Sequence, residues 1–240
     1  MPGVWTWNFG DDWAHLYLDA IGTNHNADGR GYETFGNGSA ETMRSEQPDS
    51  NTSVEWYRPL PAPPVASFLW SARDNVNYNE TAMLAALDST AQQAKTLLRN
   101  YYLKGLHSYR KGLDEAPFAF VIPAAQGDPT RVAQLIDRLI SLGVEVQRAT
   151  SALTLKEGTW PAGTYVVRLD QPYRDYAVDL LTPQNFPKDA PEAYDDISWS
   201  FPAHYHLSVT ATADPQVRAA ALAPLTEARH APAGRRSRSH

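Results

Sequence analysis

Hydrophobic positions recur with a helical period between Asn79 and Lys104, the most regular pattern in the chain. Spacing of three and four residues predicts one amphipathic helix there, with Asn79 as its N-cap and Gly105 and Gly112 as stops. We expect its apolar stripe to be buried in a core. The stripe consists of Met83, Leu84, Leu87, Ala91, Ala94, Leu97, Leu98 and Tyr101.

Beyond Ala116 the pattern predicts strands alternating with helices. The run "FAFVIP" is continuously apolar, as in a strand buried within a parallel sheet. A helix over 130–142 should follow, because Asp128 can cap it and Pro129 suits its first turn. The strand "VEVQRA" comes next and completes a predicted βαβ unit. The other expected elements are the strand "TYVVRLD", a short helix at 173–181 and a last strand "HYHLSVTAT".

These elements predict an α/β protein of two units and a tail. Residues 1–114 form the first unit, with a short helix near "DDWAHLYLDAIGTN" and then a glycine-rich stretch. Residues 115–214 form a small α/β sandwich. Residues 215–240, which end in the basic run "GRRSRSH", are expected to be a disordered tail.

Composition excludes several classes of function. The formal charge is −6, which favours neither nucleic acid nor anionic membranes as partners. The chain has no cysteine, so disulfides and thiolate catalysis are excluded. No apolar run is long enough to span a bilayer, and the first residues lack signal-peptide features, which leaves the compartment open.

The stretch "TNHNADGRGYETFGNGSAET" (23–42) offers the richest chemistry. A zinc site could use His25 and Asp28, or His204 and His206. The spacing of His204 and His206 would put both on one face of a strand. A hydrolytic zinc site, however, needs about three protein ligands. A hydrogen-bonding role in a loop suits His25 better. The glycines match a phosphate-binding loop only loosely, because the lysine and serine of a P-loop are missing.

Glu33 is the candidate general base of this stretch, with Arg30 and Tyr32 beside it. A carboxylate near aromatic side chains has its pKa raised by desolvation, which suits proton transfer near neutral pH. The alternative is a structural Glu–Arg pair at the surface. The residue pattern alone does not choose between them.

Several strings occur together in a specific order: "PGVWTWNFGDDW", "NHNADGRGYETFGNG", "WSARDNVNYNETAMLAAL", "FAFVIPAAQGDP", "GTYVVRLDQPYRDYAVDLLTPQNF" and "YDDISWSF". Over residues 2–214 they resemble the C-terminal part of bacterial zinc peptidases of the carboxypeptidase A-like family. The resemblance implies a strand–loop–helix remnant of the catalytic domain. An appended α/β domain that resembles class I glutamine amidotransferases would follow, without the nucleophilic cysteine.

The resemblance also implies a mechanism of peptide or amide hydrolysis. Zinc held by two histidines and a glutamate activates a water, and a late-strand glutamate, matched here by Glu33, acts as general base. Arg30, Tyr32 and His25 would bind the peptide substrate. The H-x-x-E zinc motif occurs nowhere in these 240 residues.

We therefore expect a C-terminal fragment of a longer enzyme that binds no zinc at the family site and is inactive alone. Its helix stripe would lack part of its cover and favour self-association. The alternative is a non-catalytic module that binds a ligand or partner at the rim formed by 123–128.

Overall fold

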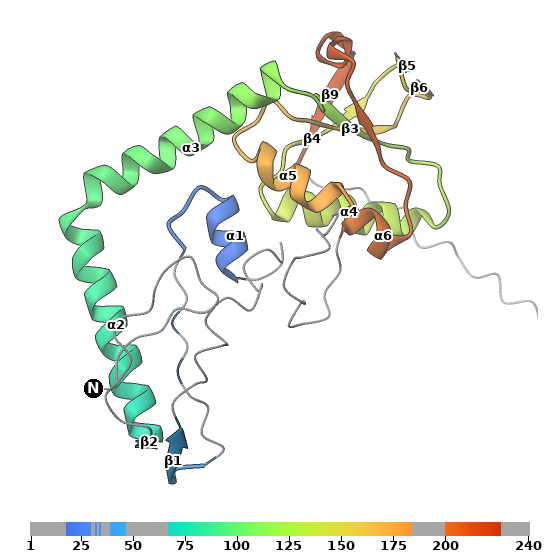
Figure 1. Cartoon of the computed structure of the whole chain (residues 1–240). Helices are drawn as coiled ribbons and strands as arrows, with labels where there is room; N and C mark the ends of the chain where they lie inside the picture. The colour runs from blue at the N-terminus through green and yellow to red at the C-terminus, as the bar shows by residue number, and fades with distance from the viewer. Residues whose placement is uncertain are drawn as a thin grey trace, which may run out of the picture.

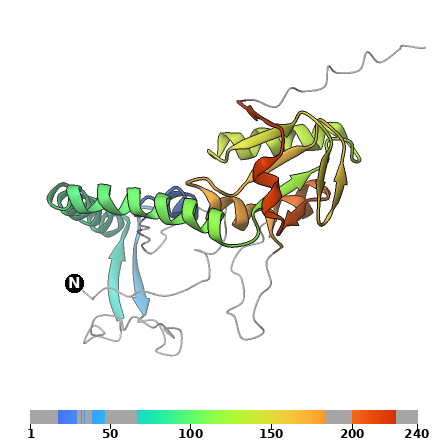
Figure 2. The same ribbon diagram turned by 90° about the horizontal axis from the view of Figure 1, so that it is seen from above.

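The structure, a computed structural model, describes residues 18–29, 32, 34, 39–46, 67–183 and 200–226. A bent arm of two helices leads into a layered α/β unit (Figure 1). The arm consists of α2 (Ala72–Gln92) and α3 (Ala94–Asp114), and α1 (Leu18–Asn24) lies inside its bend. The antiparallel strands β1 (Thr42–Glu46) and β2 (Ser67–Ser71) lie at the start of α2 (Figure 2). The chain is thus mixed α/β with antiparallel sheets.

The arm begins earlier than its apolar pattern suggests. The backbone amide and the hydroxyl of Ser71 donate to the Asp74 carboxylate at 2.9 and 2.7 Å, so Ser71, not Asn79, caps α2. The Ser71 hydroxyl, and then its amide, hold the pKa of Asp74 below its usual value. Gly105 and Gly112 lie inside α3, so their expected role as helix stops is wrong.

The expectation that the apolar stripe is core is also wrong. No residue of α2 is fully buried. Leu84, Leu87 and Leu98 expose 58%, 66% and 70% of their surface. The half-buried face of α2 carries Asn75 and Tyr78, which contact Trp70 of β2, and the stripe lies on the other side of the helix.

A five-stranded sheet forms the centre of the α/β unit, in the order β8-β3-β7-β4-β9 with every neighbouring pair antiparallel. Because β3 and β4 each run antiparallel to β7, they point the same way with β7 between them. The strand–helix–strand order is present, but the expected parallel pairing is wrong. The bounds are β3 (Ala119–Ile122), β4 (Val146–Ala149), β7 (Tyr165–Arg168), β8 (Thr210–Thr212) and β9 (Leu222–Leu225).

Both faces of this sheet are covered. Phe120 and Ile122 point to the face covered by α4 (Pro129–Ser141), α5 (Arg174–Leu181) and α6 (Phe201–Tyr205). Ala119 and Val121 point to the other face, which the hairpin of β5 (Leu153–Leu155) and β6 (Gly158–Trp160) covers together with a short 3₁₀ helix. This two-sided burial explains why "FAFVIP" is apolar throughout without a parallel neighbour.

The helix α4 follows the sequence prediction closely. The Asp128 carboxylate accepts from the amide of Thr130 at 2.8 Å and caps the helix, and Pro129 occupies its first position. The apolar stripe of α4 is buried against the sheet. It consists of Val132, Ala133, Leu135, Ile136 and Leu139.

Residues beyond Asp214 belong to the fold, so the expected disordered tail is wrong for 215–226. The 3₁₀ helix η3 (Pro215–Ala219) buries Val217, and β9 pairs with β4. Asp214 accepts from the amides of Gln216 and Lys156, both at 3.0 Å, and so joins η3 to the β5–β6 turn. The remainder of the predicted tail, 227–240, lies outside the described residues.

Glu157, in the β5–β6 turn, joins the hairpin to the end of the strand β8. Its carboxylate accepts from the Thr212 hydroxyl at 2.6 Å and from the Ala213 amide at 2.8 Å. Burial alone would raise the pKa of Glu157, but these hydrogen bonds outweigh it and lower the pKa. The stability that this carboxylate contributes is therefore present above its ordinary pKa and is lost as the pH falls through the lowered value.

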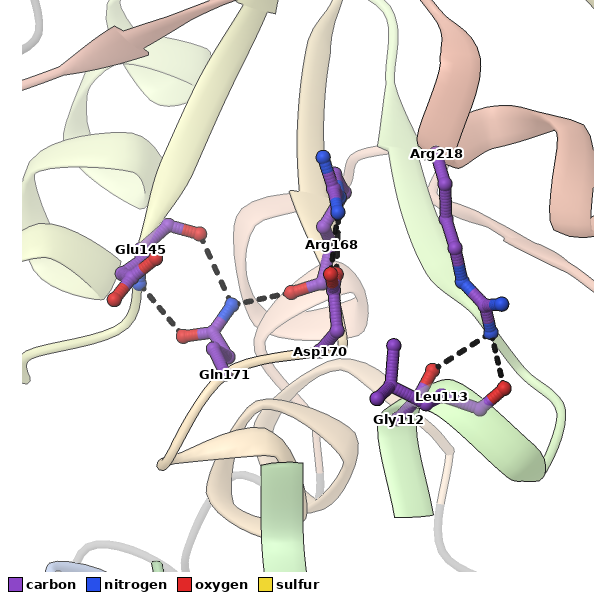
Figure 3. A network of polar contacts seen from close by, with 7 residues as sticks. All are labelled: Gly112, Leu113, Glu145, Arg168, Asp170, Gln171 and Arg218. Atoms are coloured by element: carbon purple, nitrogen blue, oxygen red, sulfur yellow. Dashed lines mark hydrogen bonds and ion pairs between the residues drawn. The ribbon is translucent and has the colours of Figure 1, made fainter. Parts of the chain in front are cut away.

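The end of the arm is fastened closely to the α/β unit. Gly112 is buried against Leu169, where a Cβ atom would lie 1.8 Å from the Leu169 carbonyl oxygen. The Arg218 guanidinium donates to the carbonyls of Gly112 and Leu113 (Figure 3). It also lies over the Phe118 ring.

Beside this contact, the buried Gln171 joins two strand ends. Its side-chain oxygen accepts from the backbone amide of Glu145 at 2.8 Å. Its side-chain nitrogen donates to the Glu145 carbonyl at 3.2 Å and to the Arg168 carbonyl (Figure 3). Arg168 also pairs with Asp170. The base of the arm thus rests on a rigid support.

Candidate functional site

The candidate site is the segment 25–34, of which the structure describes 25–29, 32 and 34. Its first residues follow α1 inside the bend of the arm. His25 begins it and lies against the α/β unit. Its ring nitrogen Nδ1 is 2.6 Å from the Ile21 carbonyl oxygen, and Nε2 is 2.7 Å from that of Leu142. Each ring nitrogen thus faces a backbone carbonyl oxygen, and a neutral ring, with one N–H, donates to one of the two. His25 joins α1 to the turn after α4.

Two tyrosines enclose the His25 ring. The centroids of Tyr173 and Tyr176 lie 4.8 and 5.1 Å from it. A hydrogen bond with Tyr101 and then burial raise the pKa of Tyr173, whereas burial and then Asp179 raise the pKa of Tyr176 to about 12. Both phenols are therefore uncharged at neutral pH and serve as packing and hydrogen-bonding groups.

The remainder of the segment is attached to the arm at two points. The Lys104 ammonium of α3 donates to the Ala27 carbonyl at 2.8 Å, and the Asn79 amide of α2 is 3.4 Å from the Thr34 hydroxyl. Tyr32 lies between these points and exposes 43% of its surface. Arg30 and Glu33 lie outside the described residues. The structure thus places two of the four predicted site residues, His25 at the α/β unit and Tyr32 in solvent.

The histidine pair expected on one strand face is arranged differently. His204 lies in α6, and His206 follows it with a left-handed φ of 53°. The expected last strand, 204–212, is limited to Thr210–Thr212, and its first three residues form the end of α6 and its C-cap. Within the part of the chain that the structure describes, no three histidine, aspartate or glutamate side chains form a group able to hold a metal ion.

A hollow of about 450 Å³ lies on the hairpin side of the sheet, between the chain after β4 and η3. Small side chains line most of it, with Ser151, Thr154 and Gln216 as polar groups. The hairpin that borders this hollow is not among the elements predicted from the sequence, although "LTLKEGTW" alternates apolar and polar residues around a short turn.

The rim predicted at 123–128 is joined to Ser208 by the side chain of Gln126. The Gln126 side chain bonds the amide and the carbonyl of Ser208 at 2.7 and 3.1 Å, and the Pro123 carbonyl at 3.0 Å. The rim was predicted because ligands bind at the carboxyl ends of parallel strands, but neighbouring strands in an antiparallel sheet do not share a carboxyl edge.

The fold defines a mixed α/β protein with antiparallel sheets, and no helix in its described part could span a bilayer. No protein-family model, curated protein or solved structure matches the chain.

Proposed function

We propose that this chain provides the substrate-binding and general-base side of a zinc carboxypeptidase-like hydrolase. The proposal starts from the resemblance of its ordered strings to that family. One structural observation supports it: Ala27 and Thr34, which precede and follow Tyr32 in the chain, are hydrogen-bonded to α3 and α2, while the tyrosine is exposed to solvent. A fastened, exposed segment suits binding, because less conformational entropy is lost when a ligand orders it.

Each residue of the segment would have a distinct role. Arg30 would bind the terminal carboxylate of a peptide through paired charge-assisted hydrogen bonds. Tyr32 would cover the substrate with its ring, and Glu33 would accept the proton of the attacking water. Zinc, when bound in an enzyme of this family, polarises the scissile carbonyl and activates the water. The described residues do not fit a zinc site, and we assign no step of the metal to them.

The likeness of residues 115–214 to class I glutamine amidotransferases is part of the same proposal. It is supported by the order β3, α4, β4. The antiparallel neighbours of β3 count against it.

Peptide binding tests the role of Arg30. The full chain is titrated calorimetrically with a short peptide carrying a free C-terminal carboxylate and with its C-terminal amide. A hydrogen bond to a charged group contributes about 1.5–3 kcal/mol, so the free acid should bind roughly 10- to 100-fold more tightly. Arg30→Ala should abolish this preference. Arg73→Ala removes an exposed arginine of α2 and should leave it unchanged.

The same sample is assayed for hydrolysis with added zinc. We expect none, because Glu33 alone does not provide a water with a pKa near 7. Chelator-sensitive hydrolysis would contradict this expectation, and equal binding of acid and amide would contradict the proposal itself.

A second function, binding of a small ligand without catalysis, is favoured by the hollow beside η3. Its volume of about 450 Å³ is in the range of small-molecule sites.

Thermal shift with a panel of amino acids and nucleotides tests this second function. A true ligand at about 100 times its Kd should stabilise the chain by about 2.7 kcal/mol. Ala219→Trp, which fills the hollow, should abolish the shift, and Ala213→Trp, outside it, should not. No shift with any compound would remove this second function.

A further inference from the structure

The arm carries an apolar face that no described part of the chain covers. It consists of Val76, Met83, Leu84, Leu87, Leu98 and Tyr102, each of which exposes more than half of its surface. On α2, the four members of the face recur at helical spacing on one side, with the exposed Glu80 between Val76 and Leu84. On α3, Leu98 and Tyr102 lie one turn apart. Scattered exposed apolar residues are ordinary, but a group of this size marks an interaction surface.

The size of this face suits a protein partner. Side chains of this kind bury on the order of 100 Å² each, so six of them approach the roughly 800 Å² per partner of a standard interface. Figures 1 and 2 show that α2 and the first half of α3 project away from the α/β unit. A second molecule can therefore reach them without displacing the sheet or its covering helices.

The charges of the two helices are opposite. The helix α2 has one basic and three acidic residues, for a net charge of −2. The helix α3 has five lysines and arginines and one aspartate, for a net charge of +4 with histidine neutral. The exposed charged residues on this side of the arm are Arg73, Glu80 and Asp88 on α2, with Glu80 between Val76 and Leu84, and Lys95 and Arg99 on α3.

This charge pattern decides how two copies would pair. An antiparallel pairing of α2 with α2, centred on Leu84, would place Glu80 of one copy beside Asp88 of the other, which is unfavourable. Pairing of α2 with α3 places acidic residues beside basic ones, and two-fold symmetry repeats this contact twice. The face is thus electrostatically complementary to a second copy of itself.

We propose that the chain forms a symmetric homodimer in which the apolar face of α2 in one copy packs against α3 of the other. The apolar side chains provide the buried area. The pairs between Glu80 or Asp88 and Lys95 or Arg99 set the orientation, because opposite charges that meet across an interface fix its register. This inference does not depend on any enzymatic activity.

Sedimentation equilibrium of the full chain tests the proposal, from about 1 µM to about 100 µM, because interfaces of standard area have Kd values of micromolar or tighter. We expect a dimer whose Kd rises at least about tenfold in Leu84→Glu. Ala85→Glu introduces the same charge on the opposite side of α2 and should leave the Kd within about twofold. Circular dichroism checks that both variants fold.

Charge exchange tests the orientation. Glu80→Lys and Lys95→Glu should each weaken the dimer, because like charges then meet across the interface. The double exchange should restore it, because the lysine at position 80 of one copy then meets the glutamate at position 95 of the other. A monomer at all concentrations, or a dimer unaffected by Leu84→Glu, would overturn the proposal. Failure of the double exchange to restore the dimer would overturn the pairing of α2 with α3. A monomer that associates only with a different protein would also refute it.

Discussion

Replacing Gly112 by alanine is expected to destabilise the protein by about 2–3 kcal/mol, the upper part of the range of about 1–3 kcal/mol that is usual for overpacking, because the clash is with backbone atoms. The new methyl group would lie 1.8 Å from the Leu169 carbonyl oxygen and 2.6 Å from the Asp170 amide nitrogen. Both are backbone atoms beside the Gln171 network, so they cannot rotate away as a side chain would. The end of α3 would have to move off the sheet and break the hydrogen bonds of Arg218.

Gly105→Ala in the same helix is the matched control. Alanine is favoured over glycine within helices by about 0.8–1 kcal/mol. At Gly105 the nearest atom would be the Asn26 side-chain nitrogen at 3.3 Å, the end of a side chain that can shift. We expect this variant to be neutral or slightly more stable.

Thermal unfolding separates the two glycine variants. A loss of 2–3 kcal/mol corresponds to a fall in the midpoint of roughly 4–12 °C for a chain of this size. Equal midpoints for both variants would mean that α3 does not approach Leu169 this closely.

Elements with a local cause could be predicted from the sequence. The helix α4 is specified by Asp128, Pro129 and a stripe at one helical period, and all of these act within the helix itself. The strands β3, β4 and β7 were found for a similar reason, since runs of β-branched and aromatic residues reflect burial.

The direction and neighbours of the strands could not be predicted in this way. Continuous apolarity reports that both faces of a strand are buried, and in β3 the hairpin provides the second cover that a helix would provide in a parallel sheet. The end of the fold was misjudged because β9 contains Pro224 and reads as loop, although it pairs with β4 at an edge where proline is tolerated.

In the candidate site, too, local features could be predicted from the sequence and long-range contacts could not. The loop role of His25 followed from its asparagine neighbours, but its contact with Leu142, 117 residues away, has no local signal. The stripe of the arm was read as core because helical periodicity reveals that a face is apolar and not what covers it. Such a face can be buried within one chain or between two.

A second large effect is expected at Val217, in the segment that the apolar pattern assigned to a disordered tail. Val217 is fully buried in η3 and packs in the smaller core with Val121, Leu153 and Val166. Val217→Asp would remove this apolar contact and place a carboxylate where no water reaches it. A buried charged group without partners costs several kcal/mol, so we expect the free energy of unfolding to fall by at least about 3 kcal/mol and the thermal midpoint to lie roughly 6–12 °C lower.

Ala219→Asp introduces the same charge at an exposed position of η3 and should change stability by less than about 0.5 kcal/mol. Should Val217→Asp unfold at the temperature of the parent chain, η3 would not belong to the core, and the boundary expected at Asp214 would stand.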